Sequence, residues 1–277
     1  MGDKAAFRLS APQQYILTST KEINLFLAGI GSGKTHLGGV ISAFYVWNFP
    51  QAVGFIGANT YNQLNTSTML RIREVWKDNF GWRDGADYVV GKQPPKGFDT
   101  SRHNFDRYDG ICSFKNGAII FLGSLDNARA HDGKQFAWAI LDETKDTREE
   151  DVKEVILGRL RQPVFGFADG WNLSLSADGG FNPLYVLTSP AKVQWINEWF
   201  GLDDYRAEIE GTIYNPETFF ANERKGRCVA ISSTHHNALN LPAGYIQRVL
   251  DNNTEERGKA LIYGNPFTRT GGEFYSS

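Results

Sequence analysis

The sequence contains few of the residues that form disulfides and transition-metal sites. Its 277 residues include only two cysteines, Cys112 and Cys228, which are too few for a disulfide framework or a zinc site. The five histidines show no metal-ligand spacing such as HExxH. We therefore expect no chemistry that depends on a disulfide or on zinc, and the composition suits a reducing cytoplasm.

Long apolar runs and a large excess of one charge are also absent. The longest mostly apolar stretch covers residues 38–49, which is too short to cross a bilayer, and the N-terminus lacks a signal-peptide pattern. Lys and Arg total 29 against 31 Asp and Glu, so the formal net charge is −2. A small nucleic-acid-binding module would usually carry a large positive excess. Residues 1–115 nevertheless hold 13 basic and 9 acidic residues, so a basic part precedes an acidic remainder.

Short apolar runs alternate with segments of helical length along the chain. Because strands that alternate with helices are typical of α/β domains, the pattern predicts a mainly parallel central sheet flanked by helices. The expected strands cover 23–28, 52–57, 136–141, 184–190 and 228–233, a hairpin covers 111–124 around Asn116-Gly117, helices cover 35–47, 63–79, 148–160 and 242–250, and loops cover 81–104 and 165–182.

A glycine-rich turn joins the first expected strand to the first expected helix. Residues 28–35 read AGIGSGKT, the spacing of a Walker A loop, although Ala28 stands where the usual pattern has glycine. The backbone N–H groups of such a loop and the N-terminus of its helix bind phosphates. Lys34 would reach the β- and γ-phosphates of a nucleotide, and the Thr35 hydroxyl would hold Mg²⁺. The alternative is a structural turn that carries a surface lysine.

Two acidic residues follow the expected strand at 136–141. Asp142 would hold Mg²⁺ through water, and Glu143 would polarise the attacking water as a general base. An acidic pair at a strand end also occurs simply near the start of a helix. A glutamate beside the magnesium aspartate favours a hydrolase over a small-molecule kinase. The two motifs together predict a P-loop NTPase of the RecA-like (ASCE) type that uses ATP and Mg²⁺.

These motifs, in this order, resemble the ATPase domain of the large terminase subunit of tailed bacteriophages, the motor that packages viral DNA into the prohead. Residues 9–19 (LSAPQQYILTS) resemble a segment in which a glutamine recognises adenine, and either Gln13 or Gln14 would fill that role. Residues 187–190 (LTSP) resemble the family's coupling motif, so Thr188 and Ser189 would relay the state of the γ-phosphate. The nucleotide would also contact Gly29, Ile30, Gly31, Ser32, Gly33, Lys34, Thr35 and His36.

The resemblance leaves the source of a transition-state arginine open. Many terminases carry an arginine inside the Walker A loop, and this loop has none. Arg129, in the segment before the acidic pair, is our expected arginine finger, acting in cis or across a subunit boundary. Arg159 and Arg161 in the stretch GRLR (158–161), which also resembles the family, are rivals. The alternative for Arg129 is a solvated loop residue.

The resemblance also implies a domain organisation and a set of partners. Residues 1–250 would form the ATPase domain, and 251–277 would form a linker toward a nuclease domain for which the chain lacks carboxylates. The implied partners are double-stranded DNA bound without sequence preference, a homo-oligomeric ring on the portal, the portal protein and the small terminase subunit. Packaging would take place in the cytoplasm of the infected bacterial host, and no membrane is involved.

Two basic segments could contact DNA phosphates, or could equally be solvated faces. They hold Arg71, Arg73 and Lys77 on an expected helix and Lys92, Lys96 and Arg102 in an expected loop. A helicase-like ATPase is a second interpretation, but it needs a second RecA-like lobe, for which the length leaves little room. A non-catalytic nucleotide-binding protein is a third, and the intact Lys34, Thr35, Asp142 and Glu143 argue against it.

Overall fold

A computed structural model describes residues 8–50, 52–131, 133–144, 147–162, 181–190 and 194–268. The chain divides into two compact units. The first comprises residues 1–8, 35–142 and 147–185, and the second comprises residues 9–34, 143–146 and 186–277. The chain therefore passes from one unit to the other inside both Walker segments, after Lys34 and after Asp142.

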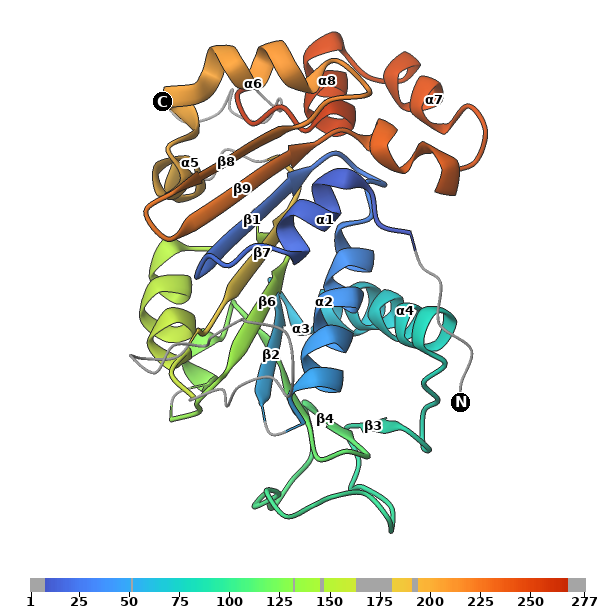
Figure 1. The fold of residues 1–277 in the computed structure, drawn as a ribbon, viewed down its shortest axis with the longest axis vertical. Helices are drawn as coiled ribbons and strands as arrows, with labels where there is room; N and C mark the ends of the chain where they lie inside the picture. Colours follow the sequence, from blue (N-terminus) through green and yellow to red (C-terminus); the bar gives the residue numbers. More distant parts are fainter. Residues whose placement is uncertain are drawn as a thin grey trace. The chain divides into compact units, whose positions relative to one another are not determined.

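The sheet of the first unit has parallel strands bordered by an antiparallel hairpin (Figure 1). Strand β2 (Val53–Ala58) pairs in parallel with β5 (Ile119–Ser124) and with β6 (Trp138–Asp142). Strands β4 (Ile111–Phe114) and β3 (Tyr88–Val90) continue the sheet antiparallel beyond β5. Every residue of β6 is buried, which explains why this strand is an uninterrupted apolar run in the sequence.

Two helices of the first unit pack closely against each other. Helix α2 (Lys34–Asn48) contacts α4 (Met69–Phe80), where the Trp76 indole donates a 3.0 Å hydrogen bond to the Ser42 hydroxyl. The same unit contains α3 (Tyr61–Gln63), the π-helical turn η1 (Leu64–Thr68), the 3₁₀ helix η2 (Ala128–His131) and the π-helical segment η4 (Asp151–Leu157).

Among the described residues, three further strands lie wholly in the second unit. Strand β1 (Ile23–Ala28) pairs in parallel with β9 (Arg227–Ser232), and β9 pairs antiparallel with β8 (Phe220–Arg224) (Figure 1). Strand β7 (Leu184–Thr188) begins in the first unit and ends in the second. The helical segments of this unit are α1 (Ala11–Leu17), α5 (Gln194–Phe200), η5 (Leu202–Tyr205), α6 (Arg206–Ile213), η6 (Thr234–Asn240), α7 (Tyr245–Asp251) and α8 (Glu255–Tyr263).

The structure confirms the expected strands and the hairpin, and it shows that two predictions were wrong in part. Residues 88–90 form strand β3 inside the expected loop at 81–104. Residues 255–263 form helix α8 inside the expected linker, with Ala260 and Ile262 buried. Most of the loop expected at 165–182, and residues 269–277, lie outside the described residues. Within the described part of the chain, no helix is long and apolar enough to span a membrane.

Glycine at position 54 is required by the close approach of Trp138. Gly54 in β2 faces the indole of Trp138 in β6, and a Cβ at position 54 would overlap that ring. Because both residues lie in the buried sheet, the overlap must be relieved by moving packed atoms. We predict that Gly54→Ala lowers the free energy of unfolding by about 1–3 kcal/mol, measured by urea denaturation.

The control is Gly158→Ala, in the same unit. Gly158 has helical dihedral angles (φ −63°, ψ −17°), and a Cβ there meets no atom within 4 Å. The free energy of unfolding of the Gly158→Ala variant should stay unchanged or rise by up to about 1 kcal/mol. Equal stability of Gly54→Ala and the unmodified chain would contradict the packing described for this pair.

Candidate nucleotide site

The loop between β1 and α2 has the backbone of a phosphate-binding turn. Gly31 and Gly33 adopt positive φ angles of 71° and 84°, a conformation that other L-residues rarely adopt. The chain curls at these two positions and then enters α2 at Lys34. The glycine spacing that predicted the loop therefore reflects its backbone conformation.

Three polar side chains hold the carbonyl groups of this loop. The Thr234 hydroxyl donates to the carbonyl of Ile30 at 2.7 Å, and the Asn237 amide donates to that of Gly31 at 2.6 Å. The Gln13 amide donates to the carbonyl of Gly33 at 3.0 Å. In a trans peptide the C=O and the following N–H point in opposite directions, so fixing the carbonyls also fixes the direction of the N–H groups.

Two amides of the loop donate hydrogen bonds to other elements of the second unit. The N–H of Gly29 donates to the carbonyl of Ser232 at 3.1 Å, and the N–H of Ile30 donates to that of Leu261 at 2.7 Å. These residues were both expected to contact the nucleotide. Their amides instead anchor the loop to the end of β9 and to α8.

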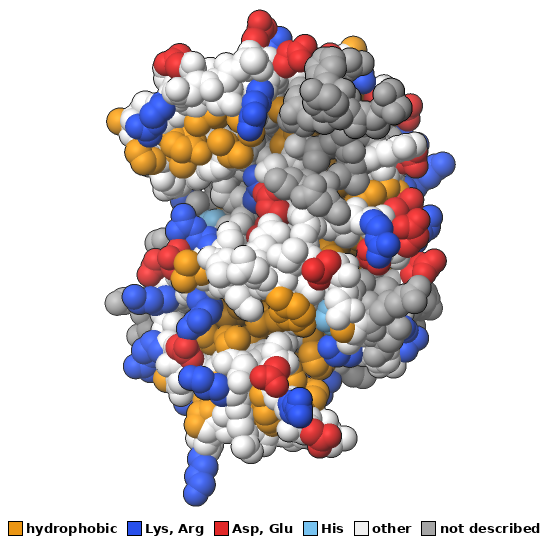
Figure 2. All heavy atoms as spheres, turned by 180° about the vertical axis from the view of Figure 1, so that it is seen from behind, with side chains coloured by type: hydrophobic (Ala, Val, Ile, Leu, Met, Phe, Trp, Pro, Cys, Tyr) orange, Lys and Arg blue, Asp and Glu red, His pale blue; other side chains and the backbone are white. Residues whose placement is uncertain are grey.

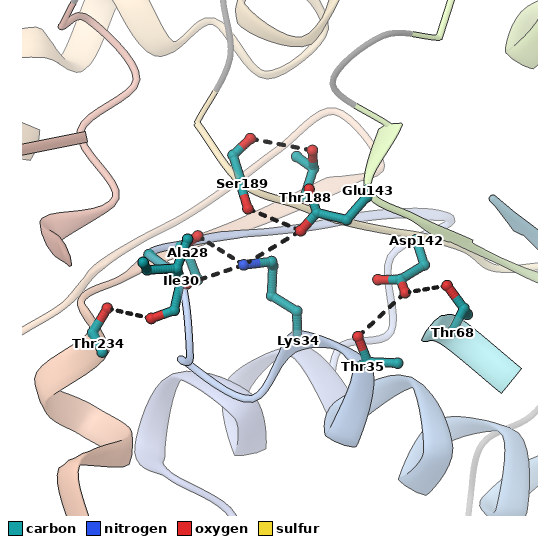
Figure 3. Close-up of polar contacts among 11 residues, drawn as sticks. Ala28, Ile30, Lys34, Thr35, Thr68, Asp142, Glu143, Thr188, Ser189 and Thr234 are labelled. Carbon is teal, nitrogen blue, oxygen red and sulfur yellow. Dashed lines mark hydrogen bonds and ion pairs between the residues drawn. The ribbon is translucent and has the colours of Figure 1, made fainter. Parts of the chain in front are cut away.

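The Lys34 ammonium is buried among oxygen atoms of the second unit (Figure 3). It donates to the carbonyls of Ala28 at 3.2 Å and Gly29 at 3.0 Å, and it lies 3.5 Å from Oε1 of Glu143. The lysine side chain is 8% exposed and the glutamate side chain 24%. The charge of the Walker A lysine is thus held beside the carboxylate that the sequence assigned as general base.

Glu143 is fixed by the end of β7. Its φ angle is 52°, unusual for a residue other than glycine, and its N–H donates to the carbonyl of Leu187 at 2.7 Å. Oε1 of Glu143 also accepts a 2.8 Å hydrogen bond from the Ser189 hydroxyl (Figure 3). The neighbouring Thr188 is buried, and its hydroxyl donates to the carbonyl of Ser189 at 3.2 Å. Of the two residues expected to couple hydrolysis to movement, Ser189 therefore contacts the expected general base directly.

A second cluster lies in the first unit and consists of hydroxyls around Asp142 (Figure 3). Thr35 donates to Oδ2 of Asp142 at 3.2 Å, and Thr68 donates to the same oxygen at 2.7 Å. A hydroxyl that donates its hydrogen keeps lone pairs for a cation. The Thr35 hydroxyl and the Asp142 carboxylate are the hard oxygen donors that Mg²⁺ prefers.

The donor set suits magnesium that also binds phosphates. Among the described residues, no group of three or more His, Cys, Asp and Glu could hold a metal ion. Mg²⁺ in nucleotide enzymes is commonly held by one or two carboxylates together with substrate phosphates and water. Thr35 and Asp142 fit that arrangement, so the expected magnesium residues do come together.

Comparison with known proteins agrees with the geometry. Residues 25–172, more than half of the chain, match the family model described as terminase large subunit, T4likevirus-type, N-terminal. The chain belongs to this terminase family. No curated protein matches the sequence.

Solved terminases share the fold of this domain. The large terminase from a thermophilic bacteriophage, in complex with ADP, aligns with 94% of this chain and 54% of its own length, at a TM-score of 0.61 and 15% identity. The same protein in complex with ATP-gamma-S aligns at 0.57 and 17% identity, over 94% of this chain and 53% of that one. The ATPase domain of the Thermus phage P74-26 large terminase aligns over 94% of both chains, at 0.56 and 14% identity.

These likenesses confirm the predicted α/β, P-loop NTPase fold of the terminase domain. At such identities they show the fold alone. The chain spans about half the length of the thermophilic bacteriophage terminase.

The structure gives different contacts to the two glutamines that were expected to recognise adenine. Gln13 is buried, and it contacts the phosphate-binding loop through Gly33. Its Oε1 accepts from the N–H of Ser10 at 2.9 Å, which fixes the side chain at the start of α1. Gln14 instead donates to the carbonyl of Leu9 at 2.8 Å. Of the two, Gln13 is therefore the residue placed at the loop.

The structure describes the three candidates for the transition-state arginine to different extents. Arg129 lies in η2, and its side chain is outside the described part of the chain, so its role as a finger stays a prediction. Arg159 and Arg161 flank Leu160, which bridges to Phe136 at the start of the Walker B segment. Phe136 precedes Asp142 by six residues, about 20 Å along an extended strand. The backbones of these two rivals are therefore anchored far from Asp142.

The two basic segments also differ. Arg71 pairs with Glu74 at 2.6 Å, and Arg73 pairs with Asp84 at 2.5 Å, so acidic partners offset much of the positive charge on α4. The loop residues Lys92, Lys96 and Arg102 are exposed. On the face drawn in Figure 2, basic and acidic side chains are interspersed. Of the two segments, the loop is the one in which all three basic residues are exposed, whereas Arg73 on the helix is only partly exposed.

Three residues of the site carried no signal in the sequence. Thr68, Thr234 and Asn237 belong to none of the motifs. In the sequence, Thr68 lies 74 residues from its partner Asp142, Thr234 lies 204 from Ile30, and Asn237 lies 206 from Gly31. Only the folded sheet brings them to the Walker segments.

Four partly buried histidines are expected to make the stability of the domain depend on pH. Burial, followed by the charge of Arg71, lowers the pKa of His36, and burial is also the main cause that lowers the pKa of His103, His235 and His236. A histidine with a lowered folded-state pKa binds fewer protons than in the unfolded chain, where its pKa is about 6.5. We predict that the free energy of unfolding decreases as the pH falls from about 7.5 to about 5.5.

Urea denaturation at the two pH values measures this change. His36→Gln removes one of the four titrating groups, so the decrease should be smaller in that variant. A free energy of unfolding that rises over the same interval would contradict the prediction.

Proposed function

We propose that the chain is an ATP-hydrolysing motor domain that powers the packaging of double-stranded DNA into a viral prohead. The observation that carries the proposal is the contact of the Glu143 carboxylate with both Lys34 and Ser189. Oε1 of Glu143, the proposed general base, thereby contacts both the proposed phosphate-binding lysine and the serine that follows the coupling strand. Membership of the terminase family supports DNA packaging as the process that the domain serves.

ATP would bind with its phosphates at the N-terminus of α2. The N–H groups of residues 31–35 would face the β- and γ-phosphates, with the Lys34 ammonium adding positive charge. Bound Mg²⁺, held by Thr35 and Asp142, would neutralise charge on the phosphate oxygens. The contact of Gln13 with the carbonyl of Gly33 supports Gln13, rather than Gln14, as the glutamine that would recognise adenine.

Hydrolysis would start with the Glu143 carboxylate. It accepts a proton from water as the water oxygen attacks the γ-phosphorus and the bond to the ADP oxygen breaks. Ser189 donates to one oxygen of this carboxylate, so a change in the charge of Glu143 alters a hydrogen bond to the residue that follows β7. This contact gives a direct path from the γ-phosphate to β7, as coupling requires. Arg129 remains our proposed transition-state arginine.

The partners rest on the family rather than on contacts of this chain. We propose double-stranded DNA as the substrate that is moved, and a homo-oligomeric ring on the portal as the working assembly. The portal protein and the small terminase subunit would complete the motor in the cytoplasm of the infected host. The exposed loop residues Lys92, Lys96 and Arg102 could bind DNA phosphates without reading sequence.

Replacing Glu143 tests the proposed chemistry. Glu143→Gln keeps the size of the side chain and removes the base, so we predict that kcat for ATP hydrolysis falls by about 10²–10⁴-fold. Affinity for ATP should change little, because the lysine and the loop are retained. Steady-state phosphate release and binding of a fluorescent ATP analogue measure the two quantities.

Glu217→Gln is the matched control, because Glu217 is an exposed glutamate of the same unit. Its kcat should stay within about twofold of the unmodified chain. A Glu143→Gln variant that hydrolyses ATP at the unmodified rate would show that Glu143 is not the base. An unmodified chain that neither binds nor hydrolyses ATP would contradict the proposed function.

A further inference from the structure

Thr68 reaches the magnesium cluster from outside both Walker motifs. It is the last residue of the π-helical turn η1 and is followed directly by α4. Its side chain is 1% exposed, so its hydroxyl must find its partner inside the protein. π-helical turns are rare and recur near functional sites, so the position of this residue at the end of one points to a role at the site.

The partner of this hydroxyl is the Walker B aspartate. Thr68 Oγ1 donates to Oδ2 of Asp142 at 2.7 Å, which is shorter than the 3.2 Å from Thr35. Short O–H···O⁻ hydrogen bonds to a carboxylate are stronger than those between neutral groups. Asp142 is only 3% exposed, so water competes little for this oxygen. The hydrogen bond from Thr68 is therefore a strong constraint on the carboxylate.

Two donors on one oxygen define the orientation of the carboxylate. The terminal torsion of an aspartate is broad and twofold, so the group turns easily when nothing holds it. Thr35 and Thr68 approach the same oxygen from α2 and from η1. Together they fix the plane of the carboxylate relative to the Thr35 hydroxyl.

We propose that Thr68 is a positioning residue for the Mg²⁺ of the bound nucleotide, acting through Asp142. The inference rests on the proposed ATPase function and deepens it. In this role Thr68 would act through Asp142 and would not itself be a ligand of the metal. It sets the direction in which Asp142 presents its oxygens, so its loss weakens Mg²⁺ binding while nucleotide binding without the metal is retained.

The test is Thr68→Val, which keeps the size of the side chain and removes the hydrogen-bond donor. Groups that orient metal ligands typically contribute about 10–100-fold to metal affinity, so we expect the Mg²⁺ concentration for half-maximal ATP hydrolysis to rise at least about 10-fold. Binding of a fluorescent ATP analogue in EDTA should equal that of the unmodified chain. Thr68→Ser retains the hydroxyl and should restore the Mg²⁺ dependence.

Thr66→Val is the matched control from the same turn. Thr66 is exposed, and its hydroxyl donates to the carbonyl of Asn62 rather than to Asp142, so its Mg²⁺ dependence should be unchanged. Circular dichroism establishes that each variant is folded. If Thr68→Val does not fold, comparison of Thr68→Ala with Thr68→Ser replaces it.

Three results would overturn the proposal for Thr68. They are an unchanged Mg²⁺ dependence in Thr68→Val, an equal loss of nucleotide affinity with and without Mg²⁺, and a folded Thr68→Ser that fails to restore the dependence. An unmodified chain that shows no Mg²⁺-dependent binding of ATP would instead overturn the proposed function. The two failures are thus distinguishable.

Discussion

The hydrogen bonds of the Glu143 carboxylate and backbone are the constraint on which the proposed catalytic arrangement depends. This residue has a positive φ angle, a conformation that costs about 1–2 kcal/mol for a residue other than glycine. The hydrogen bond from its N–H to Leu187 and the one from Ser189 to its carboxylate offset that cost. Strain held at a single acidic residue, by the end of one strand, fits a group whose direction matters for chemistry.

The remaining polar groups serve the same requirement of fixed direction. Thr234, Asn237 and Gln13 hold carbonyl groups of the phosphate-binding loop, so the peptide planes cannot turn freely. Thr35 and Thr68 hold one oxygen of Asp142. Electrostatic stabilisation of a phosphoryl-transfer reaction is effective when the dipoles are already oriented, because no reorganisation is then needed. Each unit thus supplies its own pre-oriented set of polar groups.

The sequence predicted those parts of the molecule whose signals are local. The glycines of the loop, Lys34 and Thr35 stand within a few residues of one another, and Asp142 and Glu143 directly follow a buried apolar strand. Parallel strands buried on both faces appear as apolar runs, which is why the central strands could be found. The resemblance to terminases then assigned Thr188 and Ser189 to a motif that composition alone would not reveal.

The parts that were missed depend on long-range packing. Helix α8 is short, and the linker prediction overlooked its local helix signals, which are the N-cap Thr254, the acidic first turn and Gly264 at its end. Its place beside the loop follows from the long-range hydrogen bond between Ile30 and Leu261. Nothing in the sequence distinguishes Thr68 and Asn237 from other polar residues, and only the fold brings them to Asp142 and Gly31. The choice between Gln13 and Gln14 depends in the same way on which side chain α1 directs toward Gly33.

A double-mutant cycle on Glu143 and Ser189 measures most directly whether the coupling strand acts through the general base. Single-turnover ATP hydrolysis would be compared for the unmodified chain, Ser189→Ala, Glu143→Ala and the double variant. We predict that Ser189→Ala slows hydrolysis roughly 10-fold when Glu143 is present, as loss of a hydrogen bond to a charged group implies, and has little further effect in Glu143→Ala. An equal loss in both backgrounds would contradict the central claim, because Ser189 would then act independently of the Glu143 carboxylate.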